Sequence, residues 1–407
     1  MRCGLLGKKL GHSYSPQIHS HLGEYSYELF EKTPEELGDF LLNGDFSGLN
    51  VTMPYKKDVI PYCTELTPRA ALLGAVNTIV RCEDGKLIGH NTDYFGFQSM
   101  LERSGLDVAG KKVLVLGSGG ASATAVCVLR ELKAKVIIIS RSGENNYENI
   151  SIHSDAVVIV NATPVGMYPH TGISPVNLSI FPKLEGVLDI VYNPARTQLL
   201  LNAEKRGLVT ENGLWMLVAQ AKESAEWFSG VKINDNAIQK IHGILRRQME
   251  NTILIGMPGC GKTTIGKQLA KHLGKQFVDA DAEIVSRAGI SIPEIFEKYG
   301  EVRFREIEAE VLGDLGKQSG LVIATGGGCV TRADNYDLLH QNGTIIWIQR
   351  NLHALPTDGR PLSHKDKMEA MYEIRKPLYA SFSDYIVENN SELEEALSNL
   401  IDMGGIL

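Results

Sequence analysis

The sequence KVLVLGSGGAS, residues 112–122, places a run of strand-forming residues directly before a glycine-rich turn. A helical stretch over residues 121–132 follows, and a second apolar run covers residues 136–139. A strand, a crossover helix and a second strand in this order form a βαβ unit, whose strands are parallel and buried on both faces. Because the turn leads into the helix N-terminus, a pyrophosphate group is expected there. The stretch therefore predicts an α/β fold with a parallel sheet that binds a nucleotide.

The end of the second strand indicates which dinucleotide is bound. Ser140-Arg141-Ser142 follows that strand, at the place where NAD-specific sites carry an acid for the ribose 2′-hydroxyl. An arginine between two hydroxyl side chains favours the 2′-phosphate of NADP instead. The alternative is a solvated arginine at a strand end.

A second phosphate-binding pattern lies further along the chain. Residues 256–263 read GMPGCGKT, which fits G-x-x-x-x-G-K-[ST] between an apolar strand and a helix. In such a loop the backbone N–H groups surround a β-phosphate, Lys262 reaches the β/γ oxygens, and the Thr263 hydroxyl ligates Mg²⁺. The alternative is a glycine-rich turn without a ligand. The residues expected to hold the triphosphate here are Gly259, Cys260, Gly261, Lys262, Thr263 and Thr264.

The length of 407 residues favours two or three packing units over one, since single cores stop growing near about 250–300 residues. A break is expected at residues 248–249, where a polar helical stretch gives way to the strand of the phosphate loop. We predict a substrate domain over residues 1–93, completed by helices from 214–247, and a dinucleotide-binding Rossmann domain over 94–213. Residues 249–407 are predicted to form a phosphate-loop kinase domain with a parallel sheet.

The composition is ordinary for a globular protein, with 43% hydrophobic and 22% charged residues and a net charge of −7. A weakly acidic chain has no electrostatic footprint for nucleic acid or for an anionic membrane, so we expect small-molecule partners. The apolar runs are strand-sized, so no membrane span is expected. Six scattered cysteines without a CxxC pair suit reduced thiols in the cytoplasm. Nothing in the sequence indicates an oligomeric state.

From Met249 almost to the C-terminus the chain resembles shikimate kinases. The resemblance rests on the phosphate loop and on motifs that follow it in order: DAD at 279–281, GEVRFR at 300–305, TGGG at 325–328, RPL at 360–362 and RKPLY at 375–379. Pro356 stands where that family is expected to have a second lid arginine.

The resemblance implies a role for each matching residue. Arg305 and Arg375 would clamp the shikimate carboxylate with their planar guanidinium groups. Asp281 would hold and deprotonate the acceptor hydroxyl, and Asp279 would position Mg²⁺ together with Thr263. Gly327 would let the backbone approach the substrate. Arg360, on a lid, would close over the ATP phosphates and stabilise charge in the transition state.

Residues 1 to about 245 resemble shikimate dehydrogenases. The resemblance comes from seven motifs in order: HSYSP at 12–16, NVTMPYK at 50–56, GAVNT at 74–78, GHNTD at 89–93, NATPVGM at 161–167, DIVYNP at 189–194 and NGLWMLVAQA at 212–221. This family usually carries a second basic residue a few positions after its adenine-side arginine, whereas Arg141 is followed by Gly143-Glu144-Asn145. We therefore expect a weaker preference for NADP over NAD than is common.

The resemblance again implies the roles. Lys56 and Asp93 would form the acid/base pair beside the reacting carbonyl, because hydride addition to a ketone creates an alkoxide that needs a proton. Ser13 and Ser15 would bind the substrate carboxylate. The side chains expected to hydrogen-bond the carboxylate or hydroxyls are Thr52, Asn77, Asp93, Tyr192 and Gln220. The residues expected to hold NADP are Gly117, Ser118, Gly119, Gly120, Ala121, Ser140, Arg141, Ser142, Ile190 and Gly213.

The two resemblances predict a bifunctional enzyme of the shikimate pathway. One half would reduce 3-dehydroshikimate to shikimate with NADPH, and the other would phosphorylate shikimate with MgATP to shikimate 3-phosphate. A first alternative makes the N-terminal half a quinate/shikimate dehydrogenase. A second alternative makes one half a non-catalytic nucleotide-binding module that regulates its neighbour.

Overall fold

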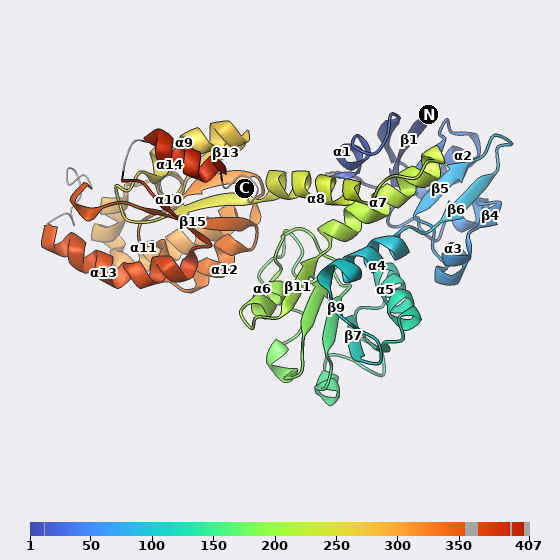
Figure 1. Cartoon of the computed structure of the whole chain (residues 1–407), viewed down its shortest axis with the longest axis horizontal. Helices are drawn as coiled ribbons and strands as arrows, with labels where there is room; N and C mark the ends of the chain where they lie inside the picture. The colour runs from blue at the N-terminus through green and yellow to red at the C-terminus, as the bar shows by residue number, and fades with distance from the viewer. Residues whose placement is uncertain (12, 355–364, 391–392, 403–407) are drawn as a thin grey trace. The chain divides into compact units, whose positions relative to one another are not determined.

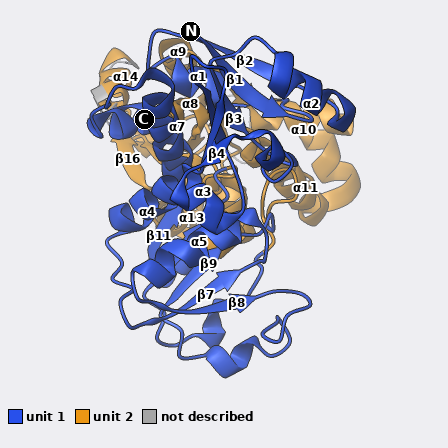
Figure 2. Ribbon diagram, turned by 90° about the vertical axis from the view of Figure 1, so that its right-hand side faces the viewer, with its two compact units in different colours: residues 1–165, 174–192, 202–244 blue, residues 166–173, 193–201, 245–407 orange. Residues whose placement is uncertain are grey.

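The computed structural model describes residues 1–11, 13–354, 365–390 and 393–402. The chain divides into two compact units, which Figure 2 colours separately. Unit 1 comprises residues 1–165, 174–192 and 202–244, and unit 2 comprises residues 166–173, 193–201 and 245–407. Among the described residues, no helix is long and apolar enough to cross a membrane.

The first sheet of unit 1 is mixed, with strand order β2-β1-β3-β5-β6-β4. The β1–β2, β1–β3 and β4–β6 pairs are parallel, whereas β5 runs antiparallel to both β3 and β6. Its strands are β1 (Arg2–Gly7), β2 (Ser26–Glu31), β3 (Gly48–Val51), β4 (Glu65–Leu66), β5 (Thr78–Arg81) and β6 (Leu87–His90). The helices of this region are α1 (Ser15–His19), α2 (Pro34–Asn43), α3 (Pro68–Leu73), α4 (Asp93–Ser104), α7 (Leu214–Ser229) and α8 (Asn236–Met249).

The second sheet of unit 1 is entirely parallel, with strand order β11-β10-β9-β7-β8. The chain leaves β7 toward β8 on one side and returns to β9 on the other, so the strand order reverses at β7. In open α/β sheets, ligands bind beyond the carboxyl ends of the strands at such a reversal. Its strands are β7 (Lys112–Leu116), β8 (Lys135–Ile139), β9 (Val158–Asn161), β10 (Gly186–Asp189) and β11 (Val209–Asn212). The helices between these strands are α5 (Gly120–Glu131) and α6 (Gln198–Glu204).

Unit 2 contains a third, parallel sheet with strand order β13-β14-β12-β15-β16. The strands are β12 (Asn251–Ile255), β13 (Gln276–Asp279), β14 (Leu321–Ala324), β15 (Gly343–Gln349) and β16 (Tyr385–Glu388). The helices are α9 (Lys262–Leu273), α10 (Ala280–Ala288), α11 (Ile292–Lys317), α12 (Asp334–His340), α13 (Lys365–Phe382) and α14 (Leu393–Asp402). Figure 1 shows α9 and α14 on one side of this sheet and α11, α12 and α13 on the other.

The described chain also contains short 3₁₀ helices at Ile60–Tyr62, Ile150–His153, Leu178–Ile180, Cys329–Thr331 and Leu352–Ala354. The sequence-based prediction of an α/β fold with a substrate domain, a Rossmann sheet and a phosphate-loop sheet is confirmed. The exact domain boundaries stay a prediction. Helix α8 runs through the junction expected at residues 248–249, and β12 begins only two residues after it ends.

The core of unit 2 includes one unusually close approach between two helices. Helices α11 and α12 pack together, and a Cβ atom added at Gly316 would lie 1.9 Å from the backbone oxygen of Leu338. A Cβ added at Gly313, one turn earlier on the same helix, would lie 3.6 Å from the nearest Leu338 side-chain atom, an ordinary contact. Position 316 therefore requires glycine, whereas position 313 has room for a methyl group.

We predict that Gly316→Ala lowers the free energy of unfolding of unit 2 by about 1–3 kcal/mol, because the added methyl group forces α11 and α12 apart. Gly313→Ala is the matched control and should be neutral or stabilising by up to about 1 kcal/mol, since alanine favours the helix. Urea titration of the full chain, read by hydrogen exchange in β14 and β15, measures both. Equal stability of the two variants would contradict the prediction.

Candidate active sites

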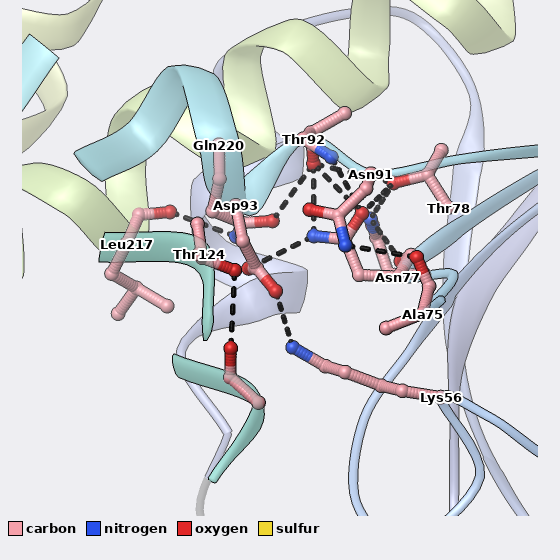
Figure 3. Close-up of polar contacts among 12 residues, drawn as sticks. Lys56, Ala75, Asn77, Thr78, Asn91, Thr92, Asp93, Thr124, Leu217 and Gln220 are labelled. Carbon is pink, nitrogen blue, oxygen red and sulfur yellow. Dashed lines mark hydrogen bonds and ion pairs between the residues drawn. The ribbon is translucent and has the colours of Figure 1, made fainter. Parts of the chain in front are cut away.

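Lys56 and Asp93 form a close ion pair in unit 1. Lys56 lies in the turn after β3, where its backbone oxygen accepts from Val76 N at 2.7 Å. Asp93 is the first residue of α4, where the helix dipole favours a negative charge. The Lys56 Nζ–Asp93 Oδ2 distance is 2.5 Å, and the two side chains are 29% and 16% exposed. Figure 3 shows the contact between Lys56 and Asp93. The pair is partly buried yet still reachable from solvent.

Asn77 fixes the second oxygen of Asp93. The Thr92 N–H donates to Asn77 Oδ1 at 2.7 Å, so the amide nitrogen of Asn77 faces the other way and donates to Asp93 Oδ1 at 2.9 Å. The Thr92 hydroxyl also lies 3.4 Å from Gln220 Oε1, which brings α7 to the same place. Figure 3 shows these side chains converging on Asp93. The structure thus gathers Lys56, Asn77, Asp93 and Gln220.

A second group of predicted residues lies at the start of α1. Ser15 N donates to Ser13 Oγ at 3.2 Å, and the rings of Tyr14 and Tyr192 meet edge to face with centroids 6.3 Å apart. Burial raises the pKa of the Tyr192 hydroxyl, which keeps it a neutral hydrogen-bond donor. Thr52 directly follows β3, where its backbone N–H donates to Leu6 O at 3.0 Å.

The predicted dinucleotide residues follow four parallel strands. Gly117 follows β7, Ser140 follows β8, Ile190 follows β10 and Gly213 follows β11, so all four lie at one edge of the second sheet. The ends of β7 and β8 are joined by a hydrogen bond from Gly117 N to Ile139 O of 2.8 Å.

The glycines at this edge leave space for a ligand. Gly117 has a φ of +106°, and a Cβ added at Gly119 or Gly120 would meet no atom within 4 Å. A Cβ at Gly213 would lie 1.9 Å from Ile190 O, so the ends of β10 and β11 touch through this glycine. The open space at the α5 N-terminus fits a pyrophosphate. Arg141 and Ser142, which follow β8 at the same edge of the sheet, are both exposed.

The phosphate loop of unit 2 lies between β12 and α9. Gly256, Gly259 and Gly261 have φ values of +142°, +85° and +103°, which side chains other than glycine rarely adopt. The buried Lys262 donates from Nζ to Gly256 O at 2.8 Å and to Met257 O at 3.1 Å. The ammonium group is thus held inside the loop, and the cradle fits a triphosphate.

The predicted metal residues meet at the start of α9. The Thr263 hydroxyl donates to Asp279 Oδ2 at 2.9 Å, while Asp279 Oδ1 caps α10 by accepting from Asp281 N at 3.1 Å. Thr263 and Thr264 are both exposed beside the loop. A hydroxyl and a carboxylate at this spacing fit Mg²⁺, which usually takes one or two protein oxygens and completes its shell with water and phosphate.

The Asp281 side chain lies beside Glu308 of α11 and the triple-glycine turn. A Cβ added at Gly326 would lie 2.7 Å from Asp281 Oδ1 and 2.8 Å from Glu308 Oε1. Arg305 Nη1 donates to Glu308 Oε2 at 2.8 Å, and a Cβ at Gly328 would lie within 2.5 Å of the same guanidinium group. Burial raises the pKa of Glu308 despite the nearby arginine.

Helix α13 also contacts the triple-glycine turn. Arg375 Nη1 donates to Gly327 O at 3.1 Å, and the Tyr379 hydroxyl donates to the same oxygen. The structure therefore brings Asp281, Arg305, Gly327 and Arg375 to one place. Arg360, predicted for the lid, and Pro356 lie outside the described residues.

Several polar residues of these sites were not predicted from the sequence. Glu308 and Tyr379 lie within or beside recognised motifs, but no role was assigned to either. Ser224 lies on α7 and hydrogen-bonds Thr92 and Thr78, both buried. A single serine within a helix carries no spacing signal, so only the folded structure shows its contacts.

Comparison with known proteins gives family matches to both parts of the chain. The family model described as Shikimate dehydrogenase substrate binding domain matches residues 5–79. The family model described as Shikimate kinase matches residues 258–403. Both matches agree with the resemblances found in the motifs.

The N-terminal part of the chain is similar to shikimate dehydrogenases over nearly their whole length. The shikimate dehydrogenase (NADP(+)) of Clostridium perfringens strain SM101 is 37% identical over 265 residues, which span 60% of this chain and 97% of the relative. The crystal structure of shikimate dehydrogenase 1 from Peptoclostridium difficile matches with a TM-score of 0.55 and 39% identity, covering 60% of this chain and 97% of that one. The Thermus thermophilus enzyme in complex with NADP(H) and shikimate matches with a TM-score of 0.55 and 30% identity, covering 60% and 98%. The chain therefore belongs to the shikimate dehydrogenase family, and its C-terminal part is a domain of the shikimate kinase family.

Proposed function

We propose that this bifunctional chain reduces 3-dehydroshikimate to shikimate with NADPH and then phosphorylates shikimate to shikimate 3-phosphate with MgATP. The observation that carries the first activity is the sheltered Lys56–Asp93 pair with Asn77 on the second carboxylate oxygen. For the second activity, the support is the convergence of Asp281, Arg305 and Arg375 beside a phosphate loop.

The proposed reduction needs a hydride and a proton at one carbonyl group. NADPH, when bound at the edge of the second sheet, supplies the hydride to the carbonyl carbon. Lys56 then gives a proton to the carbonyl oxygen, and Asp93 holds the ammonium group in place for that transfer. Ser13 and Ser15 would bind the carboxylate of the substrate. The side chains that would hydrogen-bond its carboxylate or hydroxyls are Thr52, Asn77, Tyr192 and Gln220.

The proposed phosphorylation uses two aspartates in different roles, Asp281 as the base and Asp279 as a ligand of Mg²⁺. MgATP, when bound, supplies the γ-phosphoryl group. Asp281 accepts the proton of the acceptor hydroxyl, and Arg305 and Arg375 clamp the substrate carboxylate. Thr263 and Asp279 would hold Mg²⁺, while Lys262 stabilises the phosphate oxygens. The proposed lid role of Arg360 concerns a residue outside the described part of the chain.

We also propose a cytoplasmic location. None of the six cysteines, all of which are described, forms a disulfide. This supports a reducing compartment, where thiols stay free.

A coupled assay tests the bifunctional proposal. Starting from 3-dehydroshikimate, the purified chain should consume NADPH and, once MgATP is added, produce shikimate 3-phosphate. Asp281→Asn should stop the sequence at shikimate, because the acceptor hydroxyl loses its base, with kinase kcat falling at least ~100-fold. Glu283→Gln, on the same helix, is the matched control and should complete both steps. Turnover of neither substrate would overturn the proposal, and faster oxidation of quinate than of shikimate would favour a quinate dehydrogenase.

We predict that Lys56→Ala lowers kcat for 3-dehydroshikimate reduction at least ~100-fold and leaves substrate binding mostly intact, because it removes the proton donor and no carboxylate ligand. The neighbouring Lys57 is exposed, so Lys57→Ala is the control and should retain normal turnover. Steady-state kinetics and ligand titration measure the two effects. An unchanged kcat in Lys56→Ala would rule out the role.

Arg141 is predicted to provide most of the preference for NADPH over NADH. One exposed arginine, without a second base nearby in the sequence, should give only a moderate preference. Arg141→Ala should lower kcat/KM for NADPH about 10- to 100-fold, the range expected for one charge-assisted hydrogen bond, while kcat/KM for NADH changes little. Equal losses with both cofactors would contradict a contact to the 2′-phosphate.

A further inference from the structure

The buried hydroxyl of Ser224 contacts two residues that surround Asn77, the partner of Asp93 in the proposed acid/base pair. Ser224 is on α7, one turn after Gln220, and is fully buried. Its Oγ donates to Gln220 O at 3.0 Å and accepts from Asn50 Nδ2 at 2.8 Å. It therefore ties α7 to β3 through a single oxygen atom.

The same oxygen also contacts both threonines that surround Asn77. Ser224 Oγ lies 2.8 Å from Thr78 Oγ1 and 3.0 Å from Thr92 Oγ1. Thr92 N donates to Asn77 Oδ1 at 2.7 Å, and Thr78 Oγ1 lies 3.1 Å from the same atom. Both threonines that flank Asn77 Oδ1 are thus in contact with Ser224.

The direction of the amide groups follows from these contacts. Because Asn77 Oδ1 accepts from Thr92, its Nδ2 must face Asp93. At the other end, the Tyr27 hydroxyl donates to Asn50 Oδ1 at 2.7 Å, so the amide nitrogen of Asn50 must face Ser224. The Asn50 amide therefore donates to Ser224, and the Asn77 amide is oriented by Thr92, which also contacts Ser224.

The network extends from the first sheet to the proposed acid/base pair. A series of polar contacts runs from Tyr27, through Asn50, to Ser224 and then to Thr78 and Thr92, which both contact Asn77. Since Asn77 holds Asp93, the series reaches the carboxylate that is paired with Lys56.

We infer that Ser224 is a positioning residue for the dehydrogenase reaction. It holds Thr78 and Thr92 so that Asn77 orients Asp93, and Asp93 in turn holds Lys56 at the reacting carbonyl. This inference rests on the proposed dehydrogenase function. It predicts a larger effect on kcat than on KM, because Ser224 acts on the proton-transfer pair through Asn77 while the proposed Ser13 and Ser15 contacts to the carboxylate remain.

Substitution of Ser224 in the full chain tests the inference. Ser224→Ala removes the hydroxyl and should lower kcat for 3-dehydroshikimate reduction on the order of tenfold to hundredfold, with KM within about threefold of the unsubstituted value. Ser224→Thr keeps a hydroxyl that can bond the carbonyl four residues earlier, so it should recover most of the lost kcat. Kinase turnover, measured on the same preparations, should stay unchanged in both variants.

A stability control separates positioning from a loss of folding. Val218 is fully buried on the same helix, two residues from Gln220 and so on nearly the opposite face. Val218→Ala leaves a cavity and lowers stability without removing a hydroxyl, and its dehydrogenase kcat should remain normal.

Three results would overturn the inference: normal kcat in Ser224→Ala, equal loss of kcat in Val218→Ala, or a Ser224→Thr variant as slow as Ser224→Ala. A different result bears on the proposed function itself. If the unsubstituted chain phosphorylates shikimate but does not reduce 3-dehydroshikimate, the dehydrogenase proposal fails before any variant is compared, and the positioning role falls with it.

Discussion

Parallel strands bring their carboxyl ends to one edge of a sheet, and both nucleotide sites of this protein depend on that constraint. At the second sheet, residues that follow β7, β8, β10 and β11 become neighbours although they are spread over about a hundred residues of chain. At the third sheet, the phosphate loop follows the central strand β12, and Asp279 ends β13. Glycines at these strand ends leave room for phosphate groups beside helix N-termini, where backbone N–H groups have no partner within the helix.

The substrate sites are built differently, from side chains that hold one another. In unit 2 the two carboxylates of the DAD motif separate because Asp279 caps α10 and bonds Thr263, which leaves Asp281 facing Glu308 and the glycine turn. In unit 1 the Thr92 N–H fixes the orientation of the Asn77 amide. The amide nitrogen of Asn77 can therefore donate to Asp93, the partner of Lys56. In both units, neighbouring side chains fix the position of the residue that is proposed to transfer a proton.

Such buried polar networks are costly unless every member has a partner, because an unsatisfied buried donor or acceptor costs about 1–3 kcal/mol. The hydroxyls of Thr78, Thr92 and Ser224 satisfy one another and two asparagines. Because these side chains hydrogen-bond one another, polar side chains can be buried between α7 and the first sheet. Their mutual hydrogen bonding also makes the geometry sensitive to the loss of any one hydroxyl.

The sequence by itself determined the α/β class, the two nucleotide loops and the family of each half, because glycine turns, strand periodicity and ordered motifs are local in the chain. It also placed Lys56, Asp93, Asp281 and Arg305 among the candidate residues. Only the tertiary structure decided that Asp93 is held by Asn77, that Asp279 and Asp281 face different partners, and that Ser224 contacts the residues around Asn77. Ser224 contacts residues 132, 146 and 174 positions away, and no local pattern encodes a contact at that separation.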